Sequence, residues 1–197
     1  MRVIAGSAKG RVLKSPRNNM IRPTADKVKS AFYSMIGGMI LEGSKFLDLF
    51  AGTGNMGIEA LSRGAVSCVF VDKSRHSIHL IQKNLHLTGF QDQAWVLGYD
   101  IFRALEILKN EEPFNVIYID PPYNINKVDV ILGIIYNYQL LDADGFIGVE
   151  RDKRDHCPWL EGIPYQLQQF KVYGNTQLLL LRDTDGAYQD TINRNCK

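Results

Sequence analysis

LDLFAGTGNMG, residues 47–57, decides the fold. A short apolar run leads into a turn that holds Gly52 and Gly54, and Gly57 follows where a helical pattern begins. Glycines spaced G-x-G-x-x-G between a strand and a helix allow a sharp turn, and they let the backbone lie against a ligand where a Cβ would collide. Residues 50–54, here called the glycine turn, therefore predict a cofactor site.

Apolar runs alternate with amphipathic stretches along the rest of the chain. Strands are predicted at 45–50, 67–72, 94–99, 114–119 and 145–150, and helices near 56–63, 74–87, 101–110 and 127–138. Nearly continuous apolar strands are typical of a parallel sheet covered by helices on both faces. Two final strands, 165–173 and 176–182, are joined by Gly174-Asn175 and predict an antiparallel hairpin. We expect an α/β, Rossmann-like fold: a mostly parallel seven-stranded sheet that ends in this hairpin.

Two smaller elements precede the first strand of the sheet. Residues 2–14 predict a small β-hairpin, and residues 24–40 predict a helix with Thr24 as its N-cap. The expected organisation is a basic hairpin arm over 1–23, a catalytic domain over 24–182 and a polar, mobile tail over 183–197.

Charge is distributed unevenly. The whole chain carries +2, but residues 1–29 carry +7 and the remainder −5. A basic arm on an acidic body is typical of a protein that binds a polyanion. A solvated tail would have the same composition, so charge alone leaves both interpretations open.

Length and composition exclude several classes. At 197 residues the chain suits one α/β domain, and 45% hydrophobic with 22% charged residues is typical of a globular protein. No apolar run approaches the roughly 18 residues of a membrane span, and the first residues lack a secretory signal. Three cysteines without metal-ligand spacing favour a reduced, cytoplasmic location. His76, His79 and His86 lack further donors at suitable spacing, so no metal is expected.

Three acids follow the first three strands. Asp48 lies at the end of the first strand, Asp72 ends the second and Asp100 the third. A pyrophosphate would be repelled by such a cluster, whereas S-adenosylmethionine offers an ammonium to Asp48, ribose hydroxyls to Asp72 and an adenine amine to Asp100. The acids favour S-adenosylmethionine over a nicotinamide cofactor, although each acid alone could simply cap a helix or lie in a solvated loop.

The tetrapeptide Asp120-Pro121-Pro122-Tyr123 follows the fourth strand. The exocyclic amine of a base is a poor nucleophile because its lone pair is delocalised into the ring. The Asp120 carboxylate and the Pro121 carbonyl can accept its two hydrogens, the prolines stiffen the segment, and Tyr123 offers a ring for a flipped-out base. Alone, a Pro-Pro pair would only end a strand, but this position predicts catalysis.

The chain resembles the bacterial small-subunit ribosomal RNA guanine-N2 methyltransferases. The resemblance lies in RVIAG and GR-x-L (2–13), RPTADKVKSAFYSMI (22–36), LDLFAGTGNMGIEALSRGA (47–65), VFVDKS (69–74), DPPYN (120–124) and YGNTQLLLL (173–181). It implies a class I methyltransferase fold and methyl transfer to N2 of a guanine in 16S ribosomal RNA. One departure is Lys29-Ser30, where relatives commonly carry an Arg-Glu pair.

The expected site follows from the residues and from this resemblance together. Catalytic residues are Asp120, Pro121, Pro122 and Tyr123. Cofactor-binding residues are Asp48, Phe50, Ala51, Gly52, Thr53, Gly54, Asp72, Lys73, Asp100 and Ile101. RNA-binding residues are Arg2, Lys9, Arg11, Lys14, Arg17 and Arg22. The expected partner is 16S ribosomal RNA or the assembling small subunit, bound by a monomer.

Three alternatives stay open. The same tetrapeptide suits methylation of adenine N6 in DNA or RNA, although the chain has no room for a separate DNA-recognition domain. The glycine spacing alone also suits a nicotinamide-dependent oxidoreductase. A non-catalytic RNA-binding protein could retain the fold, but the intact tetrapeptide argues against it.

Overall fold

Seven strands form one sheet in the computed structural model, which describes residues 1–16, 23–37, 41–122, 127–155, 160 and 162–183. The strands are β1 (Lys45–Leu49), β2 (Ser67–Val71), β3 (Ala94–Leu97), β4 (Phe114–Ile119), β5 (Leu141–Asp152), β6 (Tyr165–Tyr173) and β7 (Thr176–Asp183). Their order is β3-β2-β1-β4-β5-β7-β6. Strands β1 to β5 pair in parallel, whereas β7 is antiparallel to both β5 and β6.

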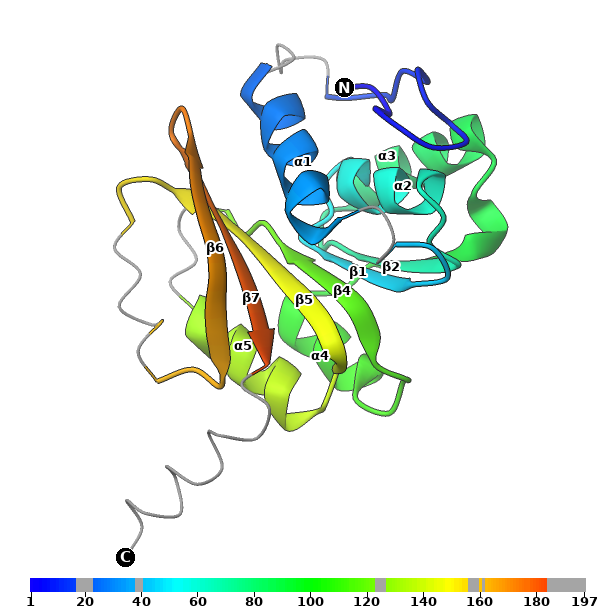
Figure 1. The fold of residues 1–197 in the computed structure, drawn as a ribbon. Coiled ribbons are helices and arrows are strands. Elements are labelled where there is room, and N and C mark those ends of the chain that lie inside the picture. Colours follow the sequence, from blue (N-terminus) through cyan, green and yellow to red (C-terminus); the bar gives the residue numbers. More distant parts are fainter. Residues whose placement is uncertain (17–22, 38–40, 123–126, 156–159, 161, 184–197) are drawn as a thin grey trace, which may run out of the picture.

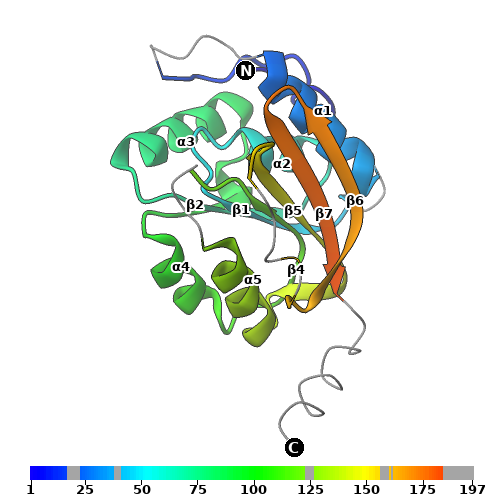
Figure 2. The ribbon, with the colours of Figure 1, turned by 90° about the vertical axis from the view of Figure 1, so that its left-hand side faces the viewer.

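Helices cover both faces of the sheet (Figures 1 and 2). They are α1 (Pro23–Ile36), α2 (Asn55–Ser62), α3 (Arg75–Thr88), α4 (Ile101–Leu108) and α5 (Val128–Asn137), with a short 3₁₀ helix, η2, at Gln91–Gln93. Figure 2 shows α1, α2 and α3 on one face and α4 and α5 on the other. In the described ranges no helix combines the length and apolarity that a bilayer span requires.

The predicted Rossmann-like sheet with its C-terminal antiparallel hairpin is confirmed. The N-terminal helix differs in detail. It begins at Pro23, so Thr24 lies in its first turn and the predicted Thr24 cap is wrong. Proline is favoured at the first helical position because its fixed φ suits the helix and its missing N–H would have no partner there. The helix ends at Ile36 rather than near residue 40, because Gly37 takes a left-handed φ of 76° that ends the helical run.

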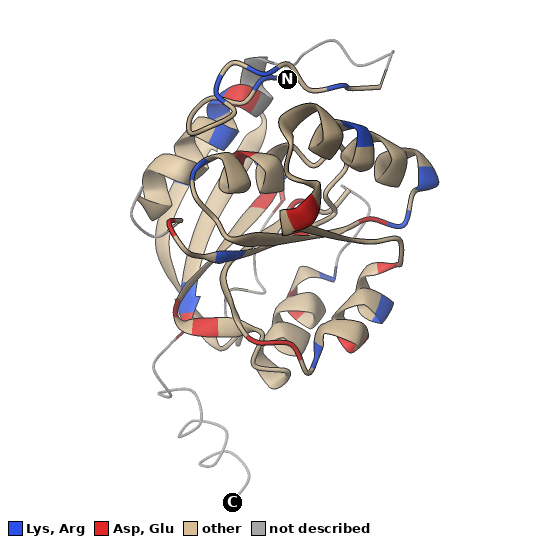
Figure 3. Ribbon diagram, turned by 90° about the vertical axis from the view of Figure 1, so that its right-hand side faces the viewer, with Lys and Arg blue, Asp and Glu red and all other residues tan. Residues whose placement is uncertain are grey.

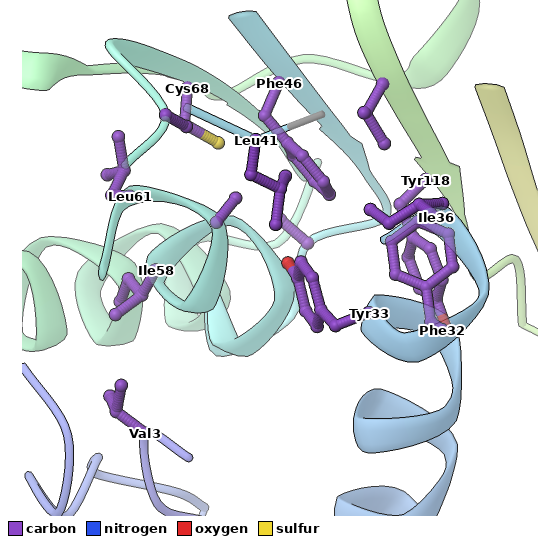
Figure 4. Packing of buried hydrophobic residues seen from close by; sticks show 14 of the residues in the cluster. Val3, Phe32, Tyr33, Ile36, Leu41, Phe46, Ile58, Leu61, Cys68 and Tyr118 are labelled. Carbon is purple, nitrogen blue, oxygen red and sulfur yellow. The ribbon is translucent and has the colours of Figure 1, made fainter. Parts of the chain in front are cut away.

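An aromatic cluster seats α1 on the sheet (Figure 4). The Phe32 ring meets the Tyr118 ring edge-on at 4.8 Å, and Tyr33 donates a hydrogen bond of 2.5 Å to the Met56 carbonyl at the start of α2. A Cβ on Gly148 of β5 would lie 2.3 Å from the Phe32 ring, so glycine is needed for this approach. Truncating a buried ring of this kind to alanine costs about 3 to 5 kcal/mol.

The N-terminal arm is docked on the body. Arg2 and Val12 form an antiparallel bridge, which supports the predicted hairpin. Ser7 N–H donates to the Ser62 carbonyl at 2.7 Å, at the end of α2. A Cβ on Gly6 would lie 1.6 Å from that same oxygen, so backbone meets backbone here. The described part of the arm, residues 1–16, is therefore ordered, and the solvated-tail interpretation does not hold for it.

Candidate active site

The carboxyl ends of β1 and β4 meet at the centre of the sheet. The winding order reverses between these two strands, and ligands of open α/β sheets bind outside the strand ends at such a switch. Asp120 N–H donates to the Leu49 carbonyl at 3.4 Å, so the residue that follows β4 lies directly beside the turn that follows β1. The predicted glycine turn and Asp120, the first residue of the tetrapeptide, are therefore brought together.

The glycine turn has an unusual backbone. Phe50, Gly52 and Gly54 have φ values of 63°, 57° and 76°. A left-handed conformation costs a side-chain-bearing residue such as Phe50 of order 1–3 kcal/mol, and such strain concentrates at ligand sites. Gly57 serves packing instead, since a Cβ there would lie 2.3 Å from the Phe70 ring of β2.

Asp72 holds the turn from the neighbouring strand. Its Oδ2 accepts a 3.0 Å hydrogen bond from Gly52 N–H, and its Oδ1 accepts one of 2.8 Å from Ser74 N–H. The carboxylate is half-buried and each oxygen retains lone-pair capacity. This geometry suits a group that accepts ribose hydroxyls.

Asp48 is buried more deeply than expected. It is 2% exposed and lies under α2, where its Oδ2 accepts a 2.9 Å hydrogen bond from Gly57 N–H. Burial, with a smaller contribution from Asp72, raises the pKa of Asp48 to about 7, against the lowering effect of the Gly57 hydrogen bond. Strand alternation explains the burial, because Phe46 and Asp48 point to the face that α2 covers. Its binding of an ammonium stays a prediction.

Asp100 acts as the N-cap of α4. Its Oδ1 accepts hydrogen bonds from Phe102 N–H at 3.1 Å and Arg103 N–H at 3.2 Å, which satisfies two free donors of the helix. The residue is exposed at the same edge of the sheet as Asp72. Ile101 is buried and Lys73 is exposed. Capping leaves Oδ2 available, so the predicted adenine contact stays a prediction.

Asp120 is the candidate catalytic carboxylate. It is accessible to solvent, Pro121 is buried and Pro122 is exposed. Protein packed around the Asp120 carboxyl, together with the Glu150 and Asp48 carboxylates, raises its pKa. Tyr123 lies outside the described residues.

A second carboxylate, that of Glu150, lies beside Asp120 and was not among the predicted site residues. Tyr118 OH donates a 2.6 Å hydrogen bond to Glu150 Oε2, and burial raises the pKa of Glu150. Burial and the nearby carboxylates also raise the pKa of Tyr118 well above its usual range, so it stays a hydrogen-bond donor. The sequence did offer a signal for Glu150, because the predicted fifth strand, GFIGVE (145–150), ends in this acid.

A buried ion pair between α1 and α2 also binds the backbone of the arm. Lys29 and Glu59 are both 0% exposed, with Lys29 Nζ 3.0 Å from Glu59 Oε2. Lys29 also donates to the Arg2 carbonyl at 2.7 Å and to Asn55 Oδ1 at 2.8 Å. Glu59 accepts from Ile4 N–H at 2.8 Å. Lys29, where this chain departs from the family pattern, therefore links α1 to α2 and to the arm.

Asn84 of α3 makes a second connection to the arm. Its Nδ2 donates to the Thr53 carbonyl of the glycine turn at 2.8 Å and to the Lys14 carbonyl at 3.0 Å. Lys14 N–H donates back to Asn84 Oδ1 at 2.7 Å. The arm and the glycine turn therefore share one side chain.

The arm presents its basic side chains to solvent. Arg2, Lys9, Arg11 and Lys14 are all exposed, while Arg17 and Arg22 lie outside the described residues. Figure 3 shows Lys and Arg along the arm near its N-terminal end and on α1 beside it. Among the described residues, no group of three or more His, Cys, Asp or Glu side chains could hold a metal ion.

This sheet order, with a glycine turn after β1 and acids after its neighbours, defines a class I methyltransferase fold. A model of the family described as conserved hypothetical protein 95 matches residues 1–182. The chain belongs to this family.

Similar proteins agree with this assignment. "Putative rRNA methyltransferase YlbH" of Bacillus subtilis is 45% identical, over 92% of this chain and 98% of its own. "Ribosomal RNA small subunit methyltransferase D" of Haemophilus influenzae is 32% identical over 78% and 79%. A solved structure titled "Putative methyltransferase yhhF from Escherichia coli" superposes with a TM-score of 0.79 at 27% identity, covering 93% of this chain and 97% of that one.

Proposed function

We propose that the protein transfers a methyl group from S-adenosylmethionine to the exocyclic N2 amine of a guanine in 16S ribosomal RNA, in the bacterial cytoplasm. The observation that carries the proposal is the position of Asp120 beside the glycine turn and close to Glu150, whose charge contributes to raising the pKa of Asp120. The names of the curated relatives support ribosomal RNA as the substrate.

The residues present fit S-adenosylmethionine. The turn offers glycines with left-handed φ and no Cβ, and Asp72 offers acceptors for hydroxyls. Asp48 lies close enough to Asp72 for the charge of Asp72 to raise its pKa. Carboxylates on both sides of the turn disfavour a pyrophosphate, which argues against a nicotinamide cofactor. When bound, S-adenosylmethionine supplies an electrophilic methyl group.

The chain's own residues prepare the amine. The Asp120 carboxylate and the Pro121 carbonyl accept its two hydrogens and direct its lone pair away from the ring. After transfer the nitrogen carries a positive charge and must lose a proton, and Asp120 takes it. Burial, followed by the like charge of Glu150, raises the pKa of the Asp120 carboxyl and so makes Asp120 a stronger base for this step.

The arm contributes affinity for the RNA backbone. Its exposed Arg2, Lys9, Arg11 and Lys14 side chains project from a backbone that is already fixed on α2 and α3, so binding needs little further ordering of the chain. Phosphate contacts of this kind make RNA binding weaken as salt rises.

The test is methylation of unmodified small ribosomal subunits and, in parallel, of DNA with tritiated cofactor, followed by mass analysis of nucleosides. N2-methylguanosine is the expected product, whereas N6-methyladenosine or methylated DNA would establish the alternative base. Asp120→Ala should bind the cofactor as wild type does in calorimetry and lose methyl transfer. Asp92→Ala, an exposed acid on η2, is the matched control and should keep full activity. Full activity of Asp120→Ala would remove Asp120 from the mechanism.

A further inference from the structure

A groove of about 500 Å³ separates α1 from the end of β6. Asp26, Lys27 and Ser30 line it from α1, and Lys171 and Tyr173 line it from β6. Its volume lies within the roughly 300–1,000 Å³ of typical ligand sites. None of the arm residues that the structure describes, 1–16, lines it, so the groove is separate from the basic side chains of that part of the arm.

The helix wall of the groove is polar along one face of α1. Asp26, Ser30 and Ser34 are spaced four residues apart and all line the groove, while Phe32 and Ile36 are buried on the opposite side. The aromatic cluster fixes α1 on the sheet through that buried side. The groove is therefore bounded by an element that is rigidly held.

One wall of the groove shares a row of the sheet with Asp120. Lys171 is paired with Leu178 on β7, and Leu178 is paired with Glu150 on β5. The parallel register of β4 and β5 continues to place Asp120 beside Glu150. Lys171, Glu150 and Asp120 thus share one row across the sheet, and three strand spacings put Lys171 about 14 Å from Asp120.

The lining groups match single-stranded RNA. Lys27 and Lys171 are exposed on opposite walls and can contact phosphates. Tyr173 is partly exposed and offers a ring on which a base can stack. Asp26 lines the same groove, and its carboxylate can accept a hydrogen bond from an amino or hydroxyl donor of a nucleotide.

We propose that this groove binds the single-stranded RNA that flanks the target nucleotide. The proposal rests on the proposed function, because it takes Asp120 as the place where the target base is presented. It assigns the arm to one part of the RNA and the groove between α1 and β6 to the few nucleotides next to the methylated one.

The test compares three variants by fluorescence anisotropy with a labelled single-stranded oligoadenylate at several salt concentrations. Lys171→Ala should weaken binding severalfold and reduce the slope of log affinity against log salt by about 0.7. Tyr173→Leu keeps apolar bulk and should weaken binding about tenfold with little change in that slope. Lys109→Ala, on the exposed end of α4, should leave both quantities unchanged.

Further measurements separate a binding defect from a folding defect. Each variant should keep wild-type cofactor affinity and thermal midpoint. On ribosomal subunits the two groove variants, Lys171→Ala and Tyr173→Leu, should raise KM and retain kcat, whereas Lys109→Ala should change neither. Wild-type oligonucleotide affinity and salt slope in both groove variants would overturn the proposal. Loss of binding to assembled subunits without loss of oligonucleotide binding would also overturn it, and would indicate a protein occupant. If the wild-type enzyme modifies no RNA while the groove variants still lose oligonucleotide binding, the proposed function fails and the groove assignment stands.

Discussion

Replacing Asp48 by Asn tests the electrostatics beneath the glycine turn. Burial raises the pKa of this carboxyl from 3.8 to about 7. The folded protein therefore holds the Asp48 proton across a pH range in which the unfolded chain has released it. Because the folded state binds more protons there, the free energy of unfolding must fall as pH rises from about 4 to about 7. A shift of about 3 pH units corresponds to about 4 kcal/mol.

Asn cannot titrate, but its Oδ1 can still accept the Gly57 hydrogen bond. Its amide adds buried donors, which cost about 1–3 kcal/mol at every pH. The diagnostic quantity is therefore the difference in unfolding free energy between Asp48→Asn and wild type, measured by urea titration from pH 5 to 8. We expect this difference to grow in favour of the variant by a few kcal/mol over that range. The same comparison for Asp92→Asn, on the exposed η2, should be flat.

A pH-independent difference for Asp48→Asn would refute the reasoning, since it would mean that the buried carboxyl does not titrate in this range. Cofactor binding gives a second measurement. If Asp48 receives the cofactor's ammonium, wild-type affinity should increase as pH rises through 7, and the variant should bind more weakly without that dependence. Equal affinities at pH 8 would exclude Asp48 from the cofactor site and leave its role in folding intact.

Two other substitutions probe the junction with the arm. Lys29→Met leaves Glu59 buried with its remaining partners and should lower the free energy of unfolding by about 3 kcal/mol in urea titration. The same substitution at an exposed lysine should cost less than about 0.5 kcal/mol. A loss below about 1 kcal/mol for Lys29→Met would contradict the buried ion pair. Gly6→Ala puts a Cβ into the Ser62 carbonyl, so the arm should detach, become sensitive to protease and lose RNA affinity. Gly10→Ala has a similar φ of 88° but meets no atom within 4 Å, and an equal effect in both variants would implicate backbone strain rather than the contact.

The strands and the glycine turn could be predicted because their signals are local. Apolar runs such as 114–119 and the glycines after the first strand carry their meaning within a few residues. The position of Asp120 beside the turn also followed, because the carboxyl ends of parallel strands share an edge. Boundaries were less certain: the helix start at Pro23 and its end before Gly37 depend on two residues whose effects compete with the apolar pattern.

The side-chain partners could not be predicted in this way. Whether Asp48 faces solvent or α2 depends on the phase of strand alternation, which one residue of register decides. The pairing of Lys29 with Glu59, and of Tyr118 with Glu150, joins residues about thirty positions apart, and nothing in either local segment specifies the partner. Charge composition likewise could not show that the arm is docked, since that depends on the close approach of Gly6 to Ser62.

Asn84 has a consequence for how this protein can be altered. Its side-chain amide donates hydrogen bonds to the carbonyls of Lys14 and Thr53, two residues that lie 39 positions apart in the sequence. Trimming or grafting the N-terminal segment would consequently remove both Lys14 partners of an amide that also holds the Thr53 carbonyl of the glycine turn. Exchange of this segment between relatives, in an attempt to retarget the enzyme, must therefore carry the matching α3 residue with it.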